Sequence, residues 1–402
     1  MLIVKKFGGS SVANRDRIYN VARRCIEDYK KGNDIVVVLS AMGDTTDELL
    51  TLARSVNPDA SKREMDMLLT TGEQVSVSLM AMAMQALGVP AISLNAYQAR
   101  MTCTSRYGNA RFKRIDTERI TNELDDRKIV IVTGFQGINK HGDYATLGRG
   151  GSDTTAVALA AALHADKCEI YTDVDGVFTA DPRVVPNARK IEEITYDEML
   201  ELATSGAKVL HSRSVELAKK YGVELVVRSS LNESEGTTVK EKVKMEKMLI
   251  TGVASDKNTA RISVHGVEDK PGIAFKIFHR LAKNNINIDI ILQSVGREGT
   301  KDISFTVSQD DLKEAVKVLE ENKEVLTIQD ITYNEDVAKV AIVGAGMMSN
   351  PGVASQMFEA LYSYGININM ISTSEIRITV LIPEKDVNRA VQAIHEKFSL
   401  AD

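Results

Sequence analysis

The first 230 residues alternate between short apolar runs and longer segments with helical periodicity. The apolar runs are rich in β-branched residues: LIVKKF, DIVVVLSA, PAISL, KIVIVTGFQG, CEIYTDV and VELVVRS. Such runs are typical of strands that are buried on both faces of a parallel sheet. Between the first two runs, the apolar residues recur at the spacing of one buried face of a helix: Ile18, Val21, Ala22, Cys25 and Ile26. Strands that alternate with helices predict an α/β sandwich with a mainly parallel sheet.

A change in residue composition near residue 235 predicts a domain boundary. The segment NESEGTTVKEKVKMEKML is polar and rich in lysine, unlike the apolar runs before it. Domain boundaries commonly fall in polar segments of this kind. We therefore expect a first domain over residues 1–235 and a linker over residues 236–248.

The remainder of the chain carries an internal repeat. Residues 264–294 match residues 344–374 at a constant offset of 80, as Pro271 and Pro351 illustrate. Each copy reads as strand, Pro-Gly turn, helix, strand, strand and helix, which predicts two α+β modules over residues 249–335 and 336–402. The apolar run LITGVASDK before the repeat can complete the second sheet, so an interleaved arrangement is the alternative.

The composition narrows the class of protein. A chain of 402 residues with 44% hydrophobic and 26% charged residues predicts a soluble protein of two or three domains. A net charge of −5 gives no reason to expect nucleic acid or membrane as a partner. Three cysteines without a C-x-x-C pair argue for a reducing compartment and against a structural zinc site. Apolar stretches shorter than a membrane span and the lack of a visible leader predict a cytoplasmic protein.

The first glycine-rich turn, KKFGGSSV, follows the first predicted strand. Gly8, Gly9 and Ser10 offer backbone N–H groups to an anion, with no Cβ in the way at the glycines. Lys6 precedes the glycines, unlike the lysine of a Walker A loop, and can place a point charge over a transferring phosphoryl group. An ordinary strand-to-helix turn with solvated lysines is the alternative.

The second glycine-rich turn, TLGRGGSDTTAVALAAALHA, leads into an alanine-rich helix. Because this helix is apolar on most sides, we expect it to be buried, with Ser152 or Asp153 as its cap. A buried helix that aims free N–H groups at a glycine-rich loop makes an anion site. Arg149 has the fork geometry that grips a carboxylate. The alternative is a tight turn with a surface arginine.

Two further motifs supply acidic and basic groups. In YTDVDGVFTADPR, a nucleotide or magnesium is expected to be faced by Thr172, Asp173, Asp175 and Asp181. We expect Arg183 to meet phosphate, and Phe178 to line an adenine pocket or simply to pack. In SGAKVLHS, Lys208 is predicted at the start of a helix, where a cation is favoured only beside a bound anion.

Glu73, in LLTTGEQVS, is predicted on a helix directly after a glycine. A carboxylate there can hold a substrate ammonium, although on its own it would be read as a surface residue. The six histidines are scattered and offer no nucleophile–base pair. A carboxylate nucleophile, with an ordinary pKa near 4, is ionised at pH 7 and needs no general base. The lysines, the arginine, the helix N-termini and magnesium fit an enzyme that brings two anions together.

Jointly these motifs resemble the aspartate kinase family, over essentially the whole chain. The motifs that carry the resemblance occur in the same order as in the family and are followed by the repeat: KFGGSSV, LSAMGDTTDEL, TTGEQVS, TLGRGGSD, YTDVDGVFTADPR and GAKVLHS. The resemblance implies an amino-acid kinase fold with two ferredoxin-like ACT modules. It also implies ATP- and Mg²⁺-dependent phosphorylation of the β-carboxylate of L-aspartate to 4-phospho-L-aspartate, which begins the synthesis of lysine, threonine and methionine.

The resemblance also implies roles for individual residues. Lys6 corresponds to the lysine that stabilises the phosphoryl group, Asp153 to the aspartate that organises the lysines, and Lys208 to a third catalytic position. Aspartate is contacted from positions that here are Ser40, Thr46, Glu73, Arg149, Gly150, Gly151 and Ser152, with Arg149 on the α-carboxylate. The nucleotide positions are Lys6, Gly8, Gly9, Ser10, Thr172, Asp173, Phe178, Arg183 and Lys208.

The repeat matches modules that bind amino-acid effectors, here lysine, threonine or both, between paired sheets. Effector contacts of the first module are implied at Asp269, Gly272, Ala274 and Gln293, and those of the second at Ser374 and Glu375. A Pro-Gly turn would look the same without a ligand. Two modules usually pair with those of a second subunit, so a homodimer or a higher homo-oligomer is expected.

Two other functions remain open from the sequence. A kinase of the same fold can act on another acid such as glutamate or an N-acylated amino acid, although an acylated amine leaves Glu73 without a partner. An amino-acid sensor with an inactive kinase half is the alternative from another class, and it is disfavoured by the intact set of charged residues.

Overall fold

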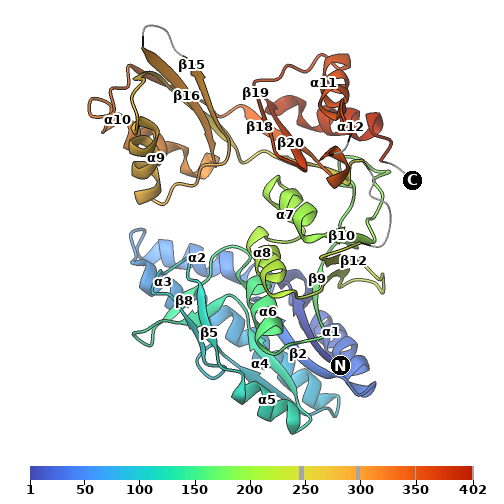
Figure 1. Ribbon diagram of the computed structural model, residues 1–402. Helices are drawn as coiled ribbons and strands as arrows, with labels where there is room; N and C mark the ends of the chain where they lie inside the picture. The colour runs from blue at the N-terminus through green and yellow to red at the C-terminus, as the bar shows by residue number, and fades with distance from the viewer. Residues whose placement is uncertain (244–248, 296–298, 349, 401–402) are drawn as a thin grey trace. The chain divides into compact units, whose positions relative to one another are not determined.

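The computed structural model describes residues 1–243, 249–295, 299–348 and 350–400, and these form two compact units (Figure 1). The first unit takes the described residues within Met1–Val177, Lys190–Ala203 and Lys208–Met245. The second takes those within Phe178–Arg189, Thr204–Ala207 and Glu246–Asp402.

An eight-stranded sheet forms the centre of the first unit, in the order β10-β12-β11-β9-β1-β2-β6-β3. Its neighbouring strands are parallel except β11 and β12, as the alternating pattern predicted. The strand bounds are β1 Leu2–Phe7, β2 Asp34–Leu39, β3 Ala91–Leu94, β6 Ile129–Thr133, β9 Lys167–Thr172, β10 Glu193–Thr195, β11 Leu225–Ser229 and β12 Thr237–Lys240.

Helices cover both faces of this sheet. Helices α1 (Arg15–Lys30) and α4 (Thr71–Ala86) share one apolar core with β1, β2 and β6, whereas α6 (Gly151–Ala162) packs against β1, β2 and β9 and against α8 (Ser212–Tyr221). The other helices of this unit are α2 Thr45–Val56, α3 Lys62–Leu69 and α5 Glu118–Asp125, with a short 3₁₀ turn at Gly9–Val12; α7, Tyr196–Thr204, ends at the boundary between the units. The α/β sandwich predicted from the sequence is confirmed.

A second, smaller sheet has the order β5-β4-β7-β8. Its strands are β4 Met101–Cys103, β5 Phe112–Ile115, β7 Gln136–Ile138 and β8 Tyr144–Thr146. Asp66 on α3 is buried and accepts hydrogen bonds of 2.8 Å from the backbone of Gly108 and from the backbone and hydroxyl of Thr146. This buried carboxylate therefore fixes α3, and with it the start of α4, to the small sheet.

The second unit contains the two copies of the repeat. Each copy has an antiparallel four-stranded sheet, ordered β15-β16-β14-β17 in the first and β13-β18-β20-β19 in the second, with two helices against its core (Figure 1). The first copy contains β14 Ala260–Glu268, α9 Ile273–Lys283, β15 Ile291–Val295, β16 Thr300–Val307, α10 Leu312–Glu320 and β17 Asp330–Asn334. The second copy contains β13 Gly252–Asp256, β18 Val337–Val343, α11 Val353–Ser363, β19 Met370–Thr373, β20 Arg377–Pro383 and α12 Val387–Lys397.

Strand β13, from the run LITGVASDK, pairs with β18 of the second copy although it precedes the first copy in sequence. Gly272 and Gly352 cap α9 and α11 with φ angles of 90° and 94°, so the Pro-Gly turns of the two copies have the same left-handed geometry. Such φ angles favour glycine, which explains why both copies carry it.

Two features differ from the expected domain layout. Residues 178–189 and 204–207 belong to the second unit and not to a continuous first domain over residues 1–235. Ala180 and Val185 lie in the core of the second module, and the hydroxyl of Thr179 binds His395 at 2.9 Å. The expected linker 236–248 begins with β12, whose Val239 is fully buried in the large sheet.

A buried ion cluster ties β1 to its neighbours. Lys5 is fully buried, and its ammonium lies 2.5 Å from Asp28 on α1 and 2.9 Å from Glu169 on β9. Burial by itself raises the pKa of Glu169, but Lys5 and Lys167 bring it down to about 2. The carboxylate is therefore charged throughout the physiological range and depends on Lys5 for compensation.

We predict that Lys5→Met destabilises the chain by about 3–5 kcal/mol, because it removes the fully buried cation that Asp28 and Glu169 share. Urea unfolding monitored by circular dichroism measures this loss. Lys31→Met is the matched control: Lys31 also pairs with Asp28 but is 69% exposed, so its loss should cost less than about 1 kcal/mol. Equal effects of the two substitutions would contradict a structural role for the buried cluster.

Candidate active site

The carboxyl ends of β1, β2, β6 and β9 meet at one edge of the large sheet, where parallel strands commonly build sites. Lys6, near the end of β1, lies on the face opposite Lys5 because strand side chains alternate. Its ammonium is 2.7 Å from the Oδ1 atom of Asp153, in the first turn of α6. Both side chains keep a little over a tenth of their surface exposed, so a ligand can reach the pair.

The glycine turn after β1 packs closely on the loop that follows β2. A Cβ at Gly9 would lie 2.7 Å from the carbonyl oxygen of Ala41, and the backbone N–H of Gly43 donates to the Gly9 carbonyl at 3.0 Å. A Cβ at Gly8 would lie 3.6 Å from the Lys6 ammonium. The turn therefore brings bare backbone next to Lys6, as an anion site requires, and Ser10 follows it in the 3₁₀ turn.

Helix α6 begins differently from the sequence prediction. Its N-cap is Gly150, with φ 67°, and not Ser152 or Asp153, which lie inside the first turn. A Cβ at Gly150 would meet the His211 ring at 2.2 Å, so close approach excludes the usual capping residues. Every residue from Gly151 to Ala160 is buried, as expected. The free N–H groups and the positive end of the helix dipole thus face the strand ends.

His211 caps α8 and lies against the glycine turn. Its Nδ1 atom accepts a hydrogen bond from the backbone of Arg213 at 3.3 Å. Burial lowers the pKa of His211, while the carboxylate of Asp153 acts in the opposite direction. The sequence analysis, which found only scattered histidines, did not predict the packing of His211 on Gly150, because this contact joins residues distant in sequence.

The substrate positions implied by the resemblance gather at the same edge. Glu73, in the first turn of α4, is 3% exposed and accepts a hydrogen bond from the backbone of Ala41 just after β2. Ser152 is buried beside Gly134, where a Cβ would lie 2.6 Å from the serine hydroxyl. Ser40 directly follows β2, and its N–H donates to the carbonyl of Phe7 at 3.2 Å.

The remaining two substrate positions are less enclosed. Thr46 is half-buried in the first turn of α2. Arg149 is exposed directly before the Gly150 cap, and within the described residues its guanidinium forms no ion pair. This leaves the guanidinium available to a carboxylate ligand.

The nucleotide positions divide between the two units. Thr172 ends β9; its hydroxyl donates to Asp173 at 3.0 Å, and its carbonyl accepts from the backbone of Ser230 at 2.8 Å. The hydroxyl of Ser11 donates to that of Ser230 at 2.8 Å, which links the glycine turn to the ends of β9 and β11.

Lys208 is exposed in the loop between α7 and α8, four residues before α8 begins at Ser212. The prediction that it starts a helix was therefore wrong. Phe178 and Arg183 lie in the second unit. The Arg183 guanidinium is 2.7 Å from Asp181, and this hydrogen-bonded pair lowers the pKa of the aspartate.

The predicted effector positions lie in the second unit. Asp269 precedes the cap of α9 and pairs with Lys301 on β16; Gly272 is the cap itself, and Ala274 follows within α9. Gln293 is exposed on β15, an edge strand of its sheet. In the second module, Ser374 and Glu375 are exposed in the turn between β19 and β20.

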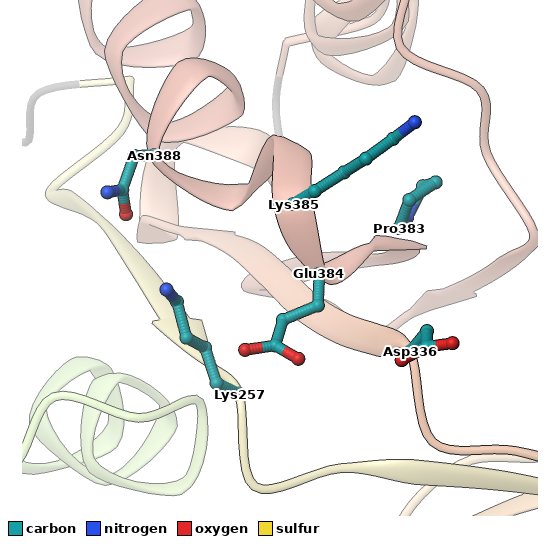
Figure 2. A pocket seen from close by; sticks show the side chains of 6 residues that line it. All are labelled: Lys257, Asp336, Pro383, Glu384, Lys385 and Asn388. Atoms are coloured by element: carbon teal, nitrogen blue, oxygen red, sulfur yellow. The ribbon is translucent and has the colours of Figure 1, made fainter.

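A surface cavity of the second unit does not coincide with these positions. It is lined by Lys257, Asp336, Pro383, Glu384, Lys385 and Asn388. Figure 2 shows that Lys385 extends away from Lys257 and Glu384, so the charged ends do not converge on a common point. Within the ranges that the structure describes, three or more metal-ligating side chains do not cluster, and helices long and apolar enough to cross a membrane do not occur.

Comparison with known proteins identifies the parts of the chain. Residues 1–229 match the amino acid kinase family, and residues 262–322 and 340–398 match the ACT domain. The aspartokinase of Bacillus sp. (strain MGA3) is 54% identical over 401 residues, covering 100% of this chain and 98% of that protein. The structure of E. coli aspartokinase III in complex with aspartate and ADP (R-state) is 27% identical, with a TM-score of 0.84 and coverage of 99% of both chains. The T-state structure with lysine and aspartate is 28% identical, with a TM-score of 0.74 and the same coverage.

Glu73 generates a prediction about stability in the absence of ligand. Burial raises its pKa to about 7 from an ordinary value of 4.5, against the opposing effect of backbone N–H groups. The folded chain therefore holds a proton that the unfolded chain releases between these two pH values, so stability falls as pH rises through this interval. We predict that Glu73→Gln matches the parent near pH 4.5 and exceeds its free energy of unfolding by about 3 kcal/mol at pH 8.

Urea unfolding at the two pH values measures the difference. Glu48→Gln, at an exposed glutamate in the first turn of α2, is the control and should change stability by less than about 0.5 kcal/mol at either pH. A stability gain for Glu73→Gln that is the same at both pH values would rule out titration of Glu73 as its cause.

Proposed function

The chain belongs to the aspartokinases of the amino acid kinase family, and from this premise we propose that Lys6 and Asp153 form the centre of its phosphoryl transfer. It is a kinase that uses ATP to phosphorylate the β-carboxylate of L-aspartate to 4-phospho-L-aspartate, within amino-acid biosynthesis. Lysine, threonine and methionine are the end products that we propose for this route. The observation that carries the residue assignment is the Lys6–Asp153 pair, 2.7 Å apart beside the bare glycine turn.

The chemistry requires charge compensation more than proton transfer. The β-carboxylate of aspartate is already a nucleophile at pH 7, so no general base is needed. Lys6 stabilises the negative charge of the phosphoryl group as it moves, and the N–H groups of Gly8, Gly9 and Ser10 bind its oxygens. Asp153 holds the Lys6 ammonium in position through their ion pair, and the free N–H groups at the start of α6 add positive potential.

Substrate orientation follows from the groups at the strand ends. Arg149 grips the α-carboxylate of aspartate, and Glu73 accepts from its ammonium. The hydroxyls of Ser40, Thr46 and Ser152 and the backbone of Gly150 and Gly151 complete the contacts. This arrangement places the remaining β-carboxylate toward Lys6.

Nucleotide binding is proposed at Thr172, Asp173 and Lys208 in the first unit. Phe178 and Arg183, the other nucleotide positions that the resemblance implies, lie in the second unit. A single carboxylate such as that of Asp173 suits Mg²⁺, which takes most of its ligands from phosphates and water. When bound with ATP, the ion neutralises charge on the phosphates. The free, buried cysteines Cys25, Cys103 and Cys168 support a cytoplasmic location.

The reaction is tested by trapping its acyl phosphate. With ATP, Mg²⁺, aspartate and hydroxylamine, the parent protein should form aspartyl hydroxamate, and Lys6→Ala should lower kcat by about 10²–10³-fold, as expected for loss of an electrostatic stabiliser. Lys30→Ala, at an exposed lysine that ends α1, is the control and should retain activity. Absence of hydroxamate from the parent protein at high aspartate would exclude the function.

Regulation by lysine, threonine or both, within a homodimer, is proposed from the two modules. Exposed apolar residues on the edge strands β15 and β19, namely Ile291, Leu292 and Ile371, support pairing with a second copy. We expect an effector to change the KM or kcat of the hydroxamate assay, and Gln293→Ala and Glu375→Ala to weaken this response at the first and second module respectively. Titration with each amino acid alone and with both, alongside analytical ultracentrifugation, checks the proposal; an unresponsive monomer would contradict it.

A further inference from the structure

Buried oxygens that lack a hydrogen-bond donor occur around the start of α4. Among the described residues of the first unit, the buried side-chain atoms without a hydrogen bond are Glu73 Oε2, Thr133 Oγ1, Gln136 Oε1 and Asp153 Oδ1. The Asp153 oxygen faces the Lys6 ammonium, so its charge is compensated. The other three are unusual, because buried polar groups in folded proteins nearly always have a partner.

Thr133 and Glu73 lie on the same side of the large sheet and at the same end. Thr133 ends β6 and alternates with Ile131 and Ile129, which pack in the core that includes α4. Glu73 lies four residues before Val77, a member of that core, and so occupies the same helix face.

The direction of α4 brings its first turn to the carboxyl ends of the strands. Near the other end of the helix, the Gln85 amide donates to the carbonyl of Ala91, at the beginning of β3. The backbone N–H of Ala41, just after β2, donates to the Glu73 carboxylate. Glu73 therefore lies at the edge where Thr133 ends β6.

Gln136 reaches the same place from the small sheet. It is fully buried, and its Nε2 atom donates to the carbonyl of Thr70 at 3.1 Å. Thr70 is the residue before α4 and lies three positions from Glu73. This hydrogen bond fixes the amide group at the start of α4 and leaves its Oε1 atom without a donor.

The chemistry of the three oxygens indicates the group that they would bind. One carboxylate and two neutral oxygens require N–H or O–H donors, and the carboxylate favours a cation. An ammonium group carries three donors and a positive charge, so it satisfies all three oxygens. An acylated nitrogen or a methylene group cannot, and would leave them unpaired in the interior.

We propose that Thr133 and Gln136 complete, with Glu73, the acceptor set for the substrate ammonium, and so determine the preference for a free amino acid. The inference rests on the proposed function, in which aspartate is the substrate and Glu73 its ammonium contact. The three oxygens are covered in the ligand-free chain, so binding shifts the side chains that cover them. Hydrogen bonds gained by all three oxygens then offset the cost of this shift.

Thr133→Val and Gln136→Met test the inference, since both keep side-chain size and remove the acceptor. Each should raise the KM for aspartate roughly 10-fold or more, the loss expected for a hydrogen bond to a charged group, with a smaller change in kcat. Succinate, which keeps both carboxylates and lacks the amine, should inhibit parent and variants with constants within about two-fold. Thr133→Val should also keep or raise the melting temperature, because it removes an unpaired buried hydroxyl.

Gln74→Met is the matched control. The Gln74 amide also donates to the Thr70 carbonyl, at 3.4 Å, but its residue is only half-buried. Its loss should leave the KM for aspartate within about two-fold of the parent. A similar loss in Gln74→Met and Gln136→Met would show that the hydrogen bond to Thr70, and not the acceptor, is what matters.

Two results would overturn the inference: weaker succinate binding by the same factor as aspartate, or an unchanged KM for aspartate in both variants. If Gln136→Met does not fold, Thr133→Val decides alone. The affinities for aspartate and succinate can also be measured by calorimetry, which does not depend on turnover. The inference is therefore decided even if the parent protein forms no hydroxamate and the proposed function fails.

Discussion

Two consecutive lysines on one buried strand are the constraint on which the site depends. Because side chains alternate along β1, Lys5 and Lys6 face opposite sides of the sheet. Lys5 meets Asp28 and Glu169 in the interior, and it stands directly opposite Glu169 in the register of β1 and β9. A slip by one residue would bring Lys6 into the core and break this pairing. The buried Lys5 thus fixes the position of Lys6, the cation proposed for phosphoryl transfer.

Close approach of backbone segments is the second constraint on the structure of the site. Gly9, Gly134 and Gly150 each lie where a Cβ would come within 2.7 Å of a neighbouring atom: the Ala41 carbonyl, the Ser152 side chain and the His211 ring. These contacts hold the turn after β1 against the loop after β2, and the start of α6 against the end of β6 and the cap of α8. The glycine motifs are therefore as much a packing requirement as a means of exposing N–H groups to an anion.

The sequence predicted the elements whose pattern is local. The six apolar runs all contain strands of the large sheet, and the offset of 80 residues identified the two modules of the second unit. The cap of α6 was wrong because the preference for serine or aspartate at a cap is a local rule, whereas the approach of His211 to Gly150 is a tertiary contact. Strand β12 was hidden in a lysine-rich stretch because only Thr237 and Val239 of its residues are buried.

The same reasoning could not identify contacts between residues that are distant in the sequence. Thr133 and Gln136 were read as strand residues, since nothing in KIVIVTGFQG shows which polar atoms find a donor after folding. The assignment of residues 178–189 to the second unit depends on pairs such as the Val253 N–H with the Thr179 carbonyl, which are distant in sequence. Lys208 was placed on a helix because the loop before Ser212 has no proline or glycine after Gly206 to mark it.

The two units are connected by more than one passage of the chain. The chain leaves the first unit after Val177 and returns to it at Lys190. The two ends of this segment are joined by a hydrogen bond, in which the Ile191 N–H donates to the Val177 carbonyl at 2.8 Å. Inside the second unit, the Thr179 hydroxyl contacts His395 and the Leu400 carbonyl of the second module. Lys208 likewise follows directly on residues 204–207 of the second unit. Among the residues proposed for ATP, Phe178 and Arg183 lie on a segment of the second unit and Lys208 directly follows another, whereas Glu73 and Arg149, proposed for aspartate, lie on segments of the first unit.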